Sequence, residues 1–574
     1  MTDTLGREVE VNYSEDFFPT TITQTWKTNN GSGSATTHTW ATFSYTTKTV
    51  ATDFDGLTVV GPPNGWQLKV LDKVTYPDQS YTKFHHNGYA QVWKAENYAA
   101  DTTLLNSVRT DLETPAANQT DVPRFAAMWT KAANFNTDQY GAPQEIKTEF
   151  TRTPNEGFSL PGSLSGTGTL IEAAMDGHPY EAVSKTWYGE TGWKEGLPLA
   201  SEDWAKPTVT GSFGLQRWTW TDWTQDDTGA DEQTNPRVVE TRVGDGISTR
   251  KTMVDYLLYP STTVSQFGLV EEVRVYDSDL STVLKQQQTD YNLNSAYVTR
   301  RIIGLPAETR SYGLETSGLN LMSKATYAYD EEDFEEEANQ IITPTRHDTA
   351  NFDDKFVVGR GNLTSVTRYD VPSEISPVTS RVRYDIAGSM VARLDPLNRK
   401  IRVEYTDAFN DSSTPGTFAY PTKVYDPADN YSTVKYRFDI GANVEAVSPA
   451  PAGQTYGKTT RRVFDSIGRL EKNSVYVSTT EQSYVRYEYP TNGVQSKVYA
   501  TLIDTNSNGP DAADEVLSEN WTDGAGRVRF SRVPHTFSGG SAAAGGATVT
   551  EYDILGRVSH QSVPVEVDGA WQPA

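Results

Sequence analysis

The stretch "TVTEYDILGRVSHQSVP" (residues 548–564) contains a compact unit, Tyr552-Asp553-Ile554-Leu555-Gly556-Arg557, between two runs of alternating polar and apolar residues. An aspartate side chain can accept hydrogen bonds from backbone N–H groups two residues further on and so start a turn. Glycine adopts the positive φ that the last position of such a turn requires. The arginine can lie over a neighbouring ring or pair with a carboxylate. The unit therefore predicts a tight turn between two strands.

The same unit recurs along the chain at irregular spacing, as in "VFDSIGRLEK", "NWTDGAGRVRF", "RYDIAGSMVARLDPLNRK" and "TDTLGREVEV". One copy alone is a generic turn, whereas a series predicts a long antiparallel sheet built from hairpins. Looser copies lie at 395–399, 425–430 and 438–441. The clear copies predict structural turn residues at Asp3, Gly6, Arg7, Tyr384, Asp385, Gly388, Phe464, Asp465, Gly468, Arg469, Asp523, Gly526, Arg527, Tyr552, Asp553, Gly556 and Arg557.

Composition agrees with an all-β chain. The 574 residues include 31 Tyr, 43 Gly and 29 Pro, which suits strands joined by frequent turns. The net charge of −25 argues against binding nucleic acid. The lack of cysteine excludes disulfides, cysteine-ligated zinc and thiol catalysis. No run of apolar residues is long enough to span a membrane, and "MTDTLGREVEVNY" has none of the features of a signal peptide.

The series of aromatic-Asp-x-x-Gly-Arg units resembles the YD-repeat, or Rhs-repeat, proteins of bacteria. The stretch that starts "LVEEVRVYDSDLSTVLKQQQTDYNLNSAYVTRRIIGLPAETRSYG" looks like the region before the repeats in large exported Rhs-type proteins. The resemblance covers about residues 180–410 and 460–565. It implies one continuous β-sheet that spirals into a hollow shell, as in insecticidal toxin complexes, polymorphic Rhs toxins and teneurins.

The resemblance also implies partners and a location. In the toxins the shell encloses a C-terminal toxic domain, so the expected partners are the rest of the same polypeptide: adjacent repeats and an enclosed domain. The expected location is outside a bacterium or on its surface. Toxin-bearing members end the shell in a "DPxGL" segment with self-cleaving aspartates. Here "LDPLNR" (394–399) and "YDPADN" (425–430) continue as repeat turns, so neither self-cleavage nor cargo is assigned to this chain.

We expect four regions: a β-rich start (1–94), a partly helical insertion (95–180), an Rhs-type sheet (181–380) and a YD-repeat spiral (381–574). The helical expectation rests on the spacing of Leu104, Leu105, Val108 and Leu112, which fits one helical face. Pro115 would end such a helix. The fold class expected for the whole chain is all-β with a minor helical insertion.

The loop "DTNSNGPDAADE" (504–515) matches the calcium-loop template D-x-[DN]-x-[DN]-G-x5-E. The template places ligands at Asp504, Asn506, Asn508 and Glu515 around the sharp turn at Gly509. The flanking segments predict strands, so a helix–loop–helix is excluded. The alternative is a long hairpin loop without metal, and calcium is the one cofactor that the sequence suggests.

The stretch "LQRWTWTDWTQDD" (215–227) gathers Trp218, Trp220 and Trp223 beside aspartates. Trp218 and Trp220 share a face if this stretch is a strand. Exposed tryptophans beside carboxylates stack on sugars, whereas buried ones fill a thick sheet. The cluster is therefore a candidate glycan-binding site or part of the packing of the shell.

Catalytic signatures are lacking. The seven histidines form no HExxH pair, and the chain has no G-x-S-x-G elbow and no zinc spacing. The leading hypothesis is a non-catalytic structural β-shell segment of an exported repeat protein, which encloses or displays a C-terminal region. The alternative is a cell-surface module that binds carbohydrate or mediates adhesion. Two of the 75 carboxylates can meet in any fold, so a glycosidase-like enzyme is the third hypothesis.

Overall fold

The computed structural model describes most of the chain. The residues that it describes are 8–27, 35–52, 62–113, 125–133, 145–176, 181–206, 212–262, 264–331, 348, 360–410, 412, 416–465, 467–501, 508–534, 545–552 and 556–567.

Within these residues, 35 strands belong to one sheet. The strands are β1 (Glu8–Tyr13), β2 (Pro19–Lys27), β3 (Ala35–Thr49), β4 (Gln67–Thr75), β5 (Tyr81–His86), β6 (Val92–Tyr98), β7 (Leu104–Thr110), β8 (Ala127–Ala132), β9 (Ile146–Leu160), β10 (Leu164–Asp176), β11 (Glu181–Tyr188), β12 (Pro198–Ala205), β13 (Gly214–Thr224), β14 (Arg237–Gly244), β15 (Thr249–Leu258), β16 (Ser265–Tyr276), β17 (Val283–Tyr291), β18 (Pro306–Glu315), β19 (Gly318–Tyr329), β20 (Leu363–Arg368), β21 (Val378–Tyr384), β22 (Met390–Leu394), β23 (Lys400–Glu404), β24 (Lys423–Tyr425), β25 (Tyr431–Tyr436), β26 (Asn443–Val447), β27 (Lys458–Phe464), β28 (Leu470–Val477), β29 (Thr480–Glu488), β30 (Gln495–Thr501), β31 (Glu515–Thr522), β32 (Val528–Pro534), β33 (Gly545–Tyr552), β34 (Val558–Gln561) and β35 (Val565–Val567).

The sheet is a continuous meander. Every strand from β1 to β33 pairs antiparallel with the next strand along the chain, from the β1–β2 pair to the β32–β33 pair. The pairing crosses all three expected region boundaries without a break. Odd-numbered strands therefore end at one border of the sheet, which we call the odd rim. Even-numbered strands end at the other border, the even rim.

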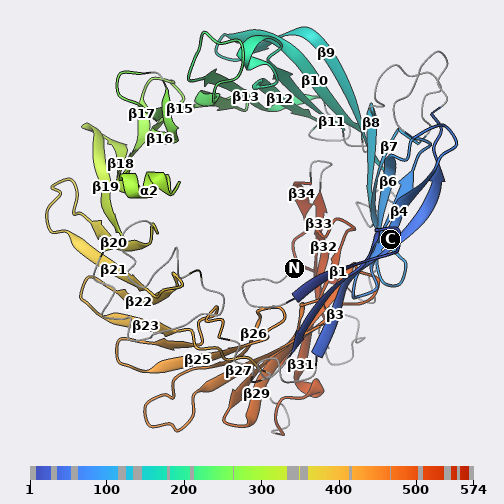
Figure 1. Ribbon diagram of the computed structural model, residues 1–574, viewed down its shortest axis with the longest axis vertical. Coiled ribbons are helices and arrows are strands. Elements are labelled where there is room, and N and C mark those ends of the chain that lie inside the picture. Colours follow the sequence, from blue (N-terminus) through green and yellow to red (C-terminus); the bar gives the residue numbers. More distant parts are fainter. Residues whose placement is uncertain are drawn as a thin grey trace.

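The sheet curves into a spiralling β-shell wall. In Figure 1 the strands follow one another around a ring, from β1–β8 through β9–β19 and back, so that β27–β33 lie beside the first strands. The expected all-β shell fold is confirmed, because one long antiparallel sheet accounts for nearly all of the regular structure. Sheets twist and coil naturally, so a long meander without a covering layer curves round on itself.

The two faces of the sheet differ. One face carries ion pairs and rings over most of its length, because the residues in register there alternate long basic, acidic and aromatic side chains. Arg109 lies over the Trp129 ring at 4.1 Å, and Glu519 is buried between Arg532 and Lys497. We call this the charged face. On the other face, Thr, Val and Ser dominate the strands around β13–β16.

The helical interpretation of residues 104–112 is wrong. Leu104–Thr110 form strand β7, which pairs with β6 and β8. Neighbouring strands offer hydrogen bonds to both of its edges, and this tertiary pairing overrides a short helical pattern. The one α-helix among the described residues is α2 (Ser295–Thr299), in the β17–β18 connection, capped by Asn294. The described part of the chain holds no helix whose length and hydropathy would let it cross a bilayer.

Candidate functional site: the repeat turns and the seam between spiral turns

The repeat units form tight turns at the rims. In the turn at Asp465, Oδ1 accepts hydrogen bonds from the backbone N–H of Ile467 (3.0 Å) and of Arg469 (2.8 Å). The main chain closes the same turn, because the Asp465 N–H donates to the Arg469 carbonyl and the Gly468 N–H to the Asp465 carbonyl. Gly468 sits at φ +84°, which explains the glycine at this position. Asp523 builds the same turn with Ala525, Gly526 and Arg527.

Other copies keep this geometry with different residues. Asp385 and Gly388 form a turn in which Ser389 replaces the arginine. Burial raises the pKa of the Asp385 carboxyl, although backbone N–H groups at Ser389 and Ala387 oppose the shift. In the looser copies, Asn398 and Asp429 take the positive-φ position.

One turn of this kind was missed in the sequence. Asn87 accepts the N–H groups of Tyr89 (2.9 Å) and Gln91 (3.0 Å), with Ala90 at φ +62°. The segment "HHNGYAQV" lacks the aspartate, and its glycine stands at another position. An asparagine followed by a strand-forming run was the available signal.

Several predicted turn residues lie outside the described residues: Asp3, Gly6, Arg7 and Asp553. In the last unit, Gly556 has φ +79° and Tyr552 is the last residue of β33.

The tyrosine of the unit binds the strand before it. The Tyr384 hydroxyl donates to the Leu363 carbonyl (2.8 Å), and Tyr552 donates to that of Val528 (2.9 Å). Each tyrosine lies near the end of an odd strand, and each acceptor lies near the start of the preceding even strand. Among the residues that the structure describes, nine tyrosines follow this pattern along the odd rim, with oxygen–oxygen distances of 2.7–3.0 Å. They are Tyr45, Tyr256, Tyr291, Tyr329, Tyr384, Tyr405, Tyr436, Tyr489 and Tyr552. Phe464 holds the aromatic position without a hydroxyl.

The arginine of the unit makes two contacts at once. The Arg469 Nε donates to Oδ2 of Asp465 (2.7 Å), and its guanidinium lies over the Tyr489 ring at 4.4 Å. Arg527 pairs with Asp523 and lies over Tyr552 in the same way. These two units therefore hold their own turns and contact the aromatic residue of a later strand.

A seam joins the start of the spiral to its end. The Asn106 side-chain amide donates to the Gly524 carbonyl (2.7 Å), and the Gly524 N–H donates to the Ala133 carbonyl (2.7 Å). The Asp101 N–H donates to the Thr491 carbonyl (3.3 Å). Further along the seam, the Gln24 side chain donates to the Asp439 carbonyl (3.3 Å), and Arg469 lies 3.9 Å from Asp78.

These contacts keep a constant offset. Asp78 lies in the β4–β5 connection and Arg469 in the β27–β28 connection, 23 strands later. The same offset of 23 joins the β6–β7 connection to the β29–β30 connection, and the β8–β9 connection to the β31–β32 connection. Because 23 is odd, the even rim of the first spiral turn lies against the odd rim of the next one.

Gly524 is the closest point of the seam. A Cβ placed on it would lie 1.5 Å from the Leu105 carbonyl oxygen, so a side chain at this position requires the two spiral turns to separate. Gly493 packs nearby, where its Cβ would meet that of Ala99 at 3.1 Å. One sequence feature points to this role: "TDGAGR" has a second glycine that the other copies lack.

The tryptophan cluster is largely part of the packing. Trp218 is 1% exposed and belongs to a core with Trp187 and Leu170. Trp220 is partly buried against that core, under the Arg242 guanidinium at 5.4 Å. The Trp223 Nε1 donates to the Pro198 carbonyl (2.9 Å). The Trp218 ring has almost no surface for a sugar, so glycan contact stays a prediction only for the partly exposed rings of Trp220 and Trp223.

The calcium-like loop is only partly described, because Asp504 and Asn506 lie outside the described residues. Glu515 accepts two hydrogen bonds from Arg486, at 2.6 and 2.7 Å, and one from Tyr484 (2.8 Å). The Arg486 hydrogen bonds hold the pKa of the Glu515 carboxyl below its usual value. The residue expected to close the calcium shell therefore has an ion-pair partner. Calcium binding stays a prediction, and within the described residues no three acidic or histidine side chains cluster as metal ligands do.

No family model and no curated protein matches the sequence. Solved structures do match. A chain of the crystal structure of TcdB2-TccC3-TEV aligns over 96% of this chain, with 10% identity and a TM-score of 0.41. A chain of the Tc holotoxin pore of Photorhabdus luminescens aligns over 98%, with 10% identity and a TM-score of 0.22. This chain spans 39% and 31% of those two chains, respectively. Chains of toxin complexes are thus among its structural neighbours.

Proposed function

We propose that this chain is a non-catalytic wall segment of a large exported bacterial repeat protein, and that it surrounds or displays another part of the same polypeptide. The observation that carries the proposal is the seam with its constant offset of 23 strands. A seam turns a ribbon of hairpins into a closed wall. Backbone hydrogen bonds and closely packed glycines join the two spiral turns, which suits a structural role for the wall.

The charged face supports the same role. Its carboxylates and cations neutralise one another across strands, as in the Glu96 cluster of His85, Lys94 and Tyr98. Cross-strand pairs of this kind stabilise a sheet whose described strands all belong to one layer. The proposed partners are therefore the adjacent repeats and the enclosed region. The acidic, cysteine-free composition fits the proposed location outside the cell.

A disulfide across the seam tests closure of the wall. The chain has no cysteine, so two introduced cysteines have only each other as partners. The ideal Cβ of Gly493 lies 3.1 Å from the Ala99 Cβ, close to the separation that a disulfide spans. We expect the double variant Ala99→Cys/Gly493→Cys to cross-link in air, with a shift on a non-reducing gel and loss of two hydrogens by intact mass.

The matched control joins Gly493→Cys with Ser317→Cys, which lies on a part of the even rim outside the seam contacts. This pair should stay reduced. Cross-linking of the control at the same rate, or no cross-link in the Ala99/Gly493 pair at a folded far-UV spectrum, would contradict a closed wall.

A further inference from the structure

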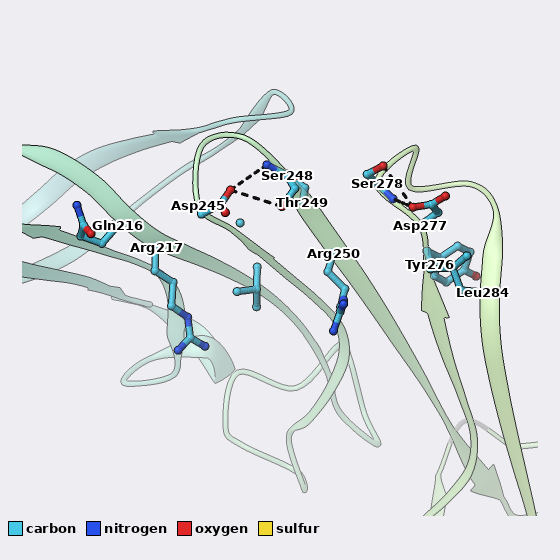
Figure 2. A pocket seen from close by; sticks show the side chains of 12 residues that line it. Gln216, Arg217, Asp245, Ser248, Thr249, Arg250, Tyr276, Asp277, Ser278 and Leu284 are labelled. Atoms are coloured by element: carbon cyan, nitrogen blue, oxygen red, sulfur yellow. Dashed lines mark hydrogen bonds between the residues drawn. The ribbon is translucent and has the colours of Figure 1, made fainter. Parts of the chain in front are cut away.

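A trough lies on the face of the sheet opposite the charged face, which buries Trp218. Figure 2 shows a trough of about 730 Å³ near the even rim, between the β14–β15 and β16–β17 turns. Trp218 pairs with Gly244 and packs on it from the charged face. Side chains of neighbouring residues in a strand point to opposite faces. Arg217 and Val243 therefore face the other way, and Arg250 joins them because it pairs with Val243.

The arginines of the trough have no internal partner. Arg217 and Arg250 are both exposed, and neither has a hydrogen bond or ion pair in the part of the chain that the structure describes. On the charged face of the same strands, by contrast, Arg242 pairs with Glu240 and Arg274 with Glu272. In a chain of net charge −25, exposed arginines without a carboxylate are available to an outside anion.

The cations form a row across the strands. Arg217 is on β13 and Arg250 on β15, with Val243 of β14 between them; Figure 2 shows both guanidinium groups extending to the same side of the sheet. Lys285 of β17 faces the same way, because Thr252 pairs with Val275 and Val275 with Lys285. Alternate strands lie about 10 Å apart. The row therefore fits a ligand whose negative charges are regularly spaced rather than a single small anion.

The rim of the trough adds acceptors. Oδ1 of Asp245 accepts the N–H groups of Ile247 (2.9 Å) and Ser248 (2.8 Å), which orients the carboxylate. These hydrogen bonds, that from Ser248 first, lower the pKa of the Asp245 carboxyl. Asp277 is held in the same way by Ser278 (2.7 Å). The ionised carboxylates accept hydrogen bonds from hydroxyl groups, which a sugar offers on every ring and the side chains of an acidic peptide lack.

The trough offers arginines that can pair with carboxylates, aspartates that can accept hydrogen bonds from hydroxyl groups, and a small apolar surface. Together these features describe one class of ligand. We propose that this trough binds a carbohydrate that carries carboxylates, of the oligouronic acid type. Arg217 and Arg250 pair with sugar carboxylates, Asp245 and Asp277 accept hydrogen bonds from sugar hydroxyls, and Val243 contacts the C–H face of a ring. The site is separate from the seam, so it stands whether or not the wall encloses a cargo.

Calorimetric titration of the full chain tests the proposal with three probes: trigalacturonic acid, neutral galactotriose and triglutamate. We expect the acidic sugar to bind, and to bind more weakly as salt rises, because the pairs are exposed. Galactotriose should bind at least tenfold more weakly. Absence of heat with trigalacturonic acid would overturn the proposal. Equally tight binding of triglutamate would overturn the carbohydrate assignment, since an acidic peptide would then be the better ligand.

Matched variants locate the site. Arg217→Gln/Arg250→Gln should weaken trigalacturonic acid binding at least tenfold while the melting temperature stays within the error of the parent. Arg393→Gln is the control, because Arg393 is also exposed and has no partner among the described residues, but lies on β22. Unchanged binding in the double variant, or an equal loss in the control, would show that this trough is not the site.

Discussion

The turn at Asp523 and the turn at Asp395 have the same internal structure in different surroundings. In both, Oδ1 accepts two backbone N–H groups at 2.9 and 3.0 Å. In both, Oδ2 accepts the arginine Nε, at 2.7 Å for Arg527 and 2.6 Å for Arg399. The local sequence alone therefore produces the turn.

Their surroundings differ because only one of them lies in the seam. The Asp523 side chain is fully buried and its turn contacts Leu105 and Ala133 of the first spiral turn. The Asp395 side chain is 31% exposed, its Arg399 is 65% exposed, and its turn lies on the even rim beyond the seam contacts. The comparison separates the turn geometry, which the repeat sequence produces locally, from the burial and the contacts that closure of the wall adds.

Gly524→Val should have the largest effect. Its side chain would overlap the Leu105 carbonyl oxygen, so the seam must open at a cost of about 3 kcal/mol. Urea unfolding measures this cost, and small-angle scattering should show a larger radius of gyration. Pro396→Val, at the matching position of the exposed turn, should leave the radius unchanged. Equal behaviour of the two variants would mean that the seam adds no stability.

Asp523→Ala should come next. The variant leaves two backbone N–H groups and Arg527 without their acceptor in a buried place, which costs about 2–3 kcal/mol. Asp395→Ala should cost clearly less, because water reaches the same groups there. The midpoints of urea unfolding of the two variants, each compared with the parent, measure the difference between the two losses of stability. A larger loss at Asp395 would contradict the role of burial.

Gly468→Val tests the turn itself. A β-branched residue at φ +84° is strained, and we expect a loss of more than about 1 kcal/mol. The exposed turn provides the control, since Asn398 occupies the same position at φ +58° and Asn398→Gly relieves strain there. Thermal unfolding should place the first variant below the parent and the second at or slightly above it.

Tyr489→Phe should cost about 1 kcal/mol, since it removes one hydrogen bond to the Leu470 carbonyl. Phe464 occupies the corresponding position naturally, so the variant should fold. Tyr487→Phe, two residues earlier, removes a hydroxyl outside this row and should change little. Identical losses in both would argue against the tyrosine row as a stabilising feature.

High pH should weaken the odd rim as a whole. Burial raises the pKa of row tyrosines such as Tyr291, Tyr384 and Tyr329 above the ordinary value of 10.0, to about 12 for Tyr329. A raised pKa in the folded state means that the stabilisation is complete below pH 10 and is lost as pH rises towards 12. The melting temperature should therefore fall by a few degrees over that interval, and less in Tyr489→Phe, which has one fewer buried phenol.

The sequence predicted the parts of the fold that are local. Aspartate, glycine and arginine at fixed spacing specify the turn at Asp465 by themselves, and period-two alternation specifies the strands. The seam could not be predicted, because Asn106 and Gly524 are 418 residues apart and their contact depends on the curvature of the whole sheet. Residues 104–112 were misassigned because a short apolar run fits a helix as well as a strand.

The candidate sites divide in the same way. The tryptophan pattern correctly placed Trp218 and Trp220 on one face, but only the structure shows which face is packed. The calcium template placed Glu515 at the twelfth position without any sign that Arg486, on a neighbouring part of the sheet, would pair with it. The cation row of the trough lies on three strands that alternate in the sheet, so no contiguous stretch of sequence contains it.

The offset of 23 strands has a geometric consequence for how such a wall grows. With strands about 4.8 Å apart, 23 of them give a perimeter of about 110 Å and a diameter of about 35 Å, close to the size of a small folded domain. Extra hairpins leave this bore unchanged and add height, by about one strand length for every circuit. Duplication of repeats can thus lengthen the wall with no change of its cross-section.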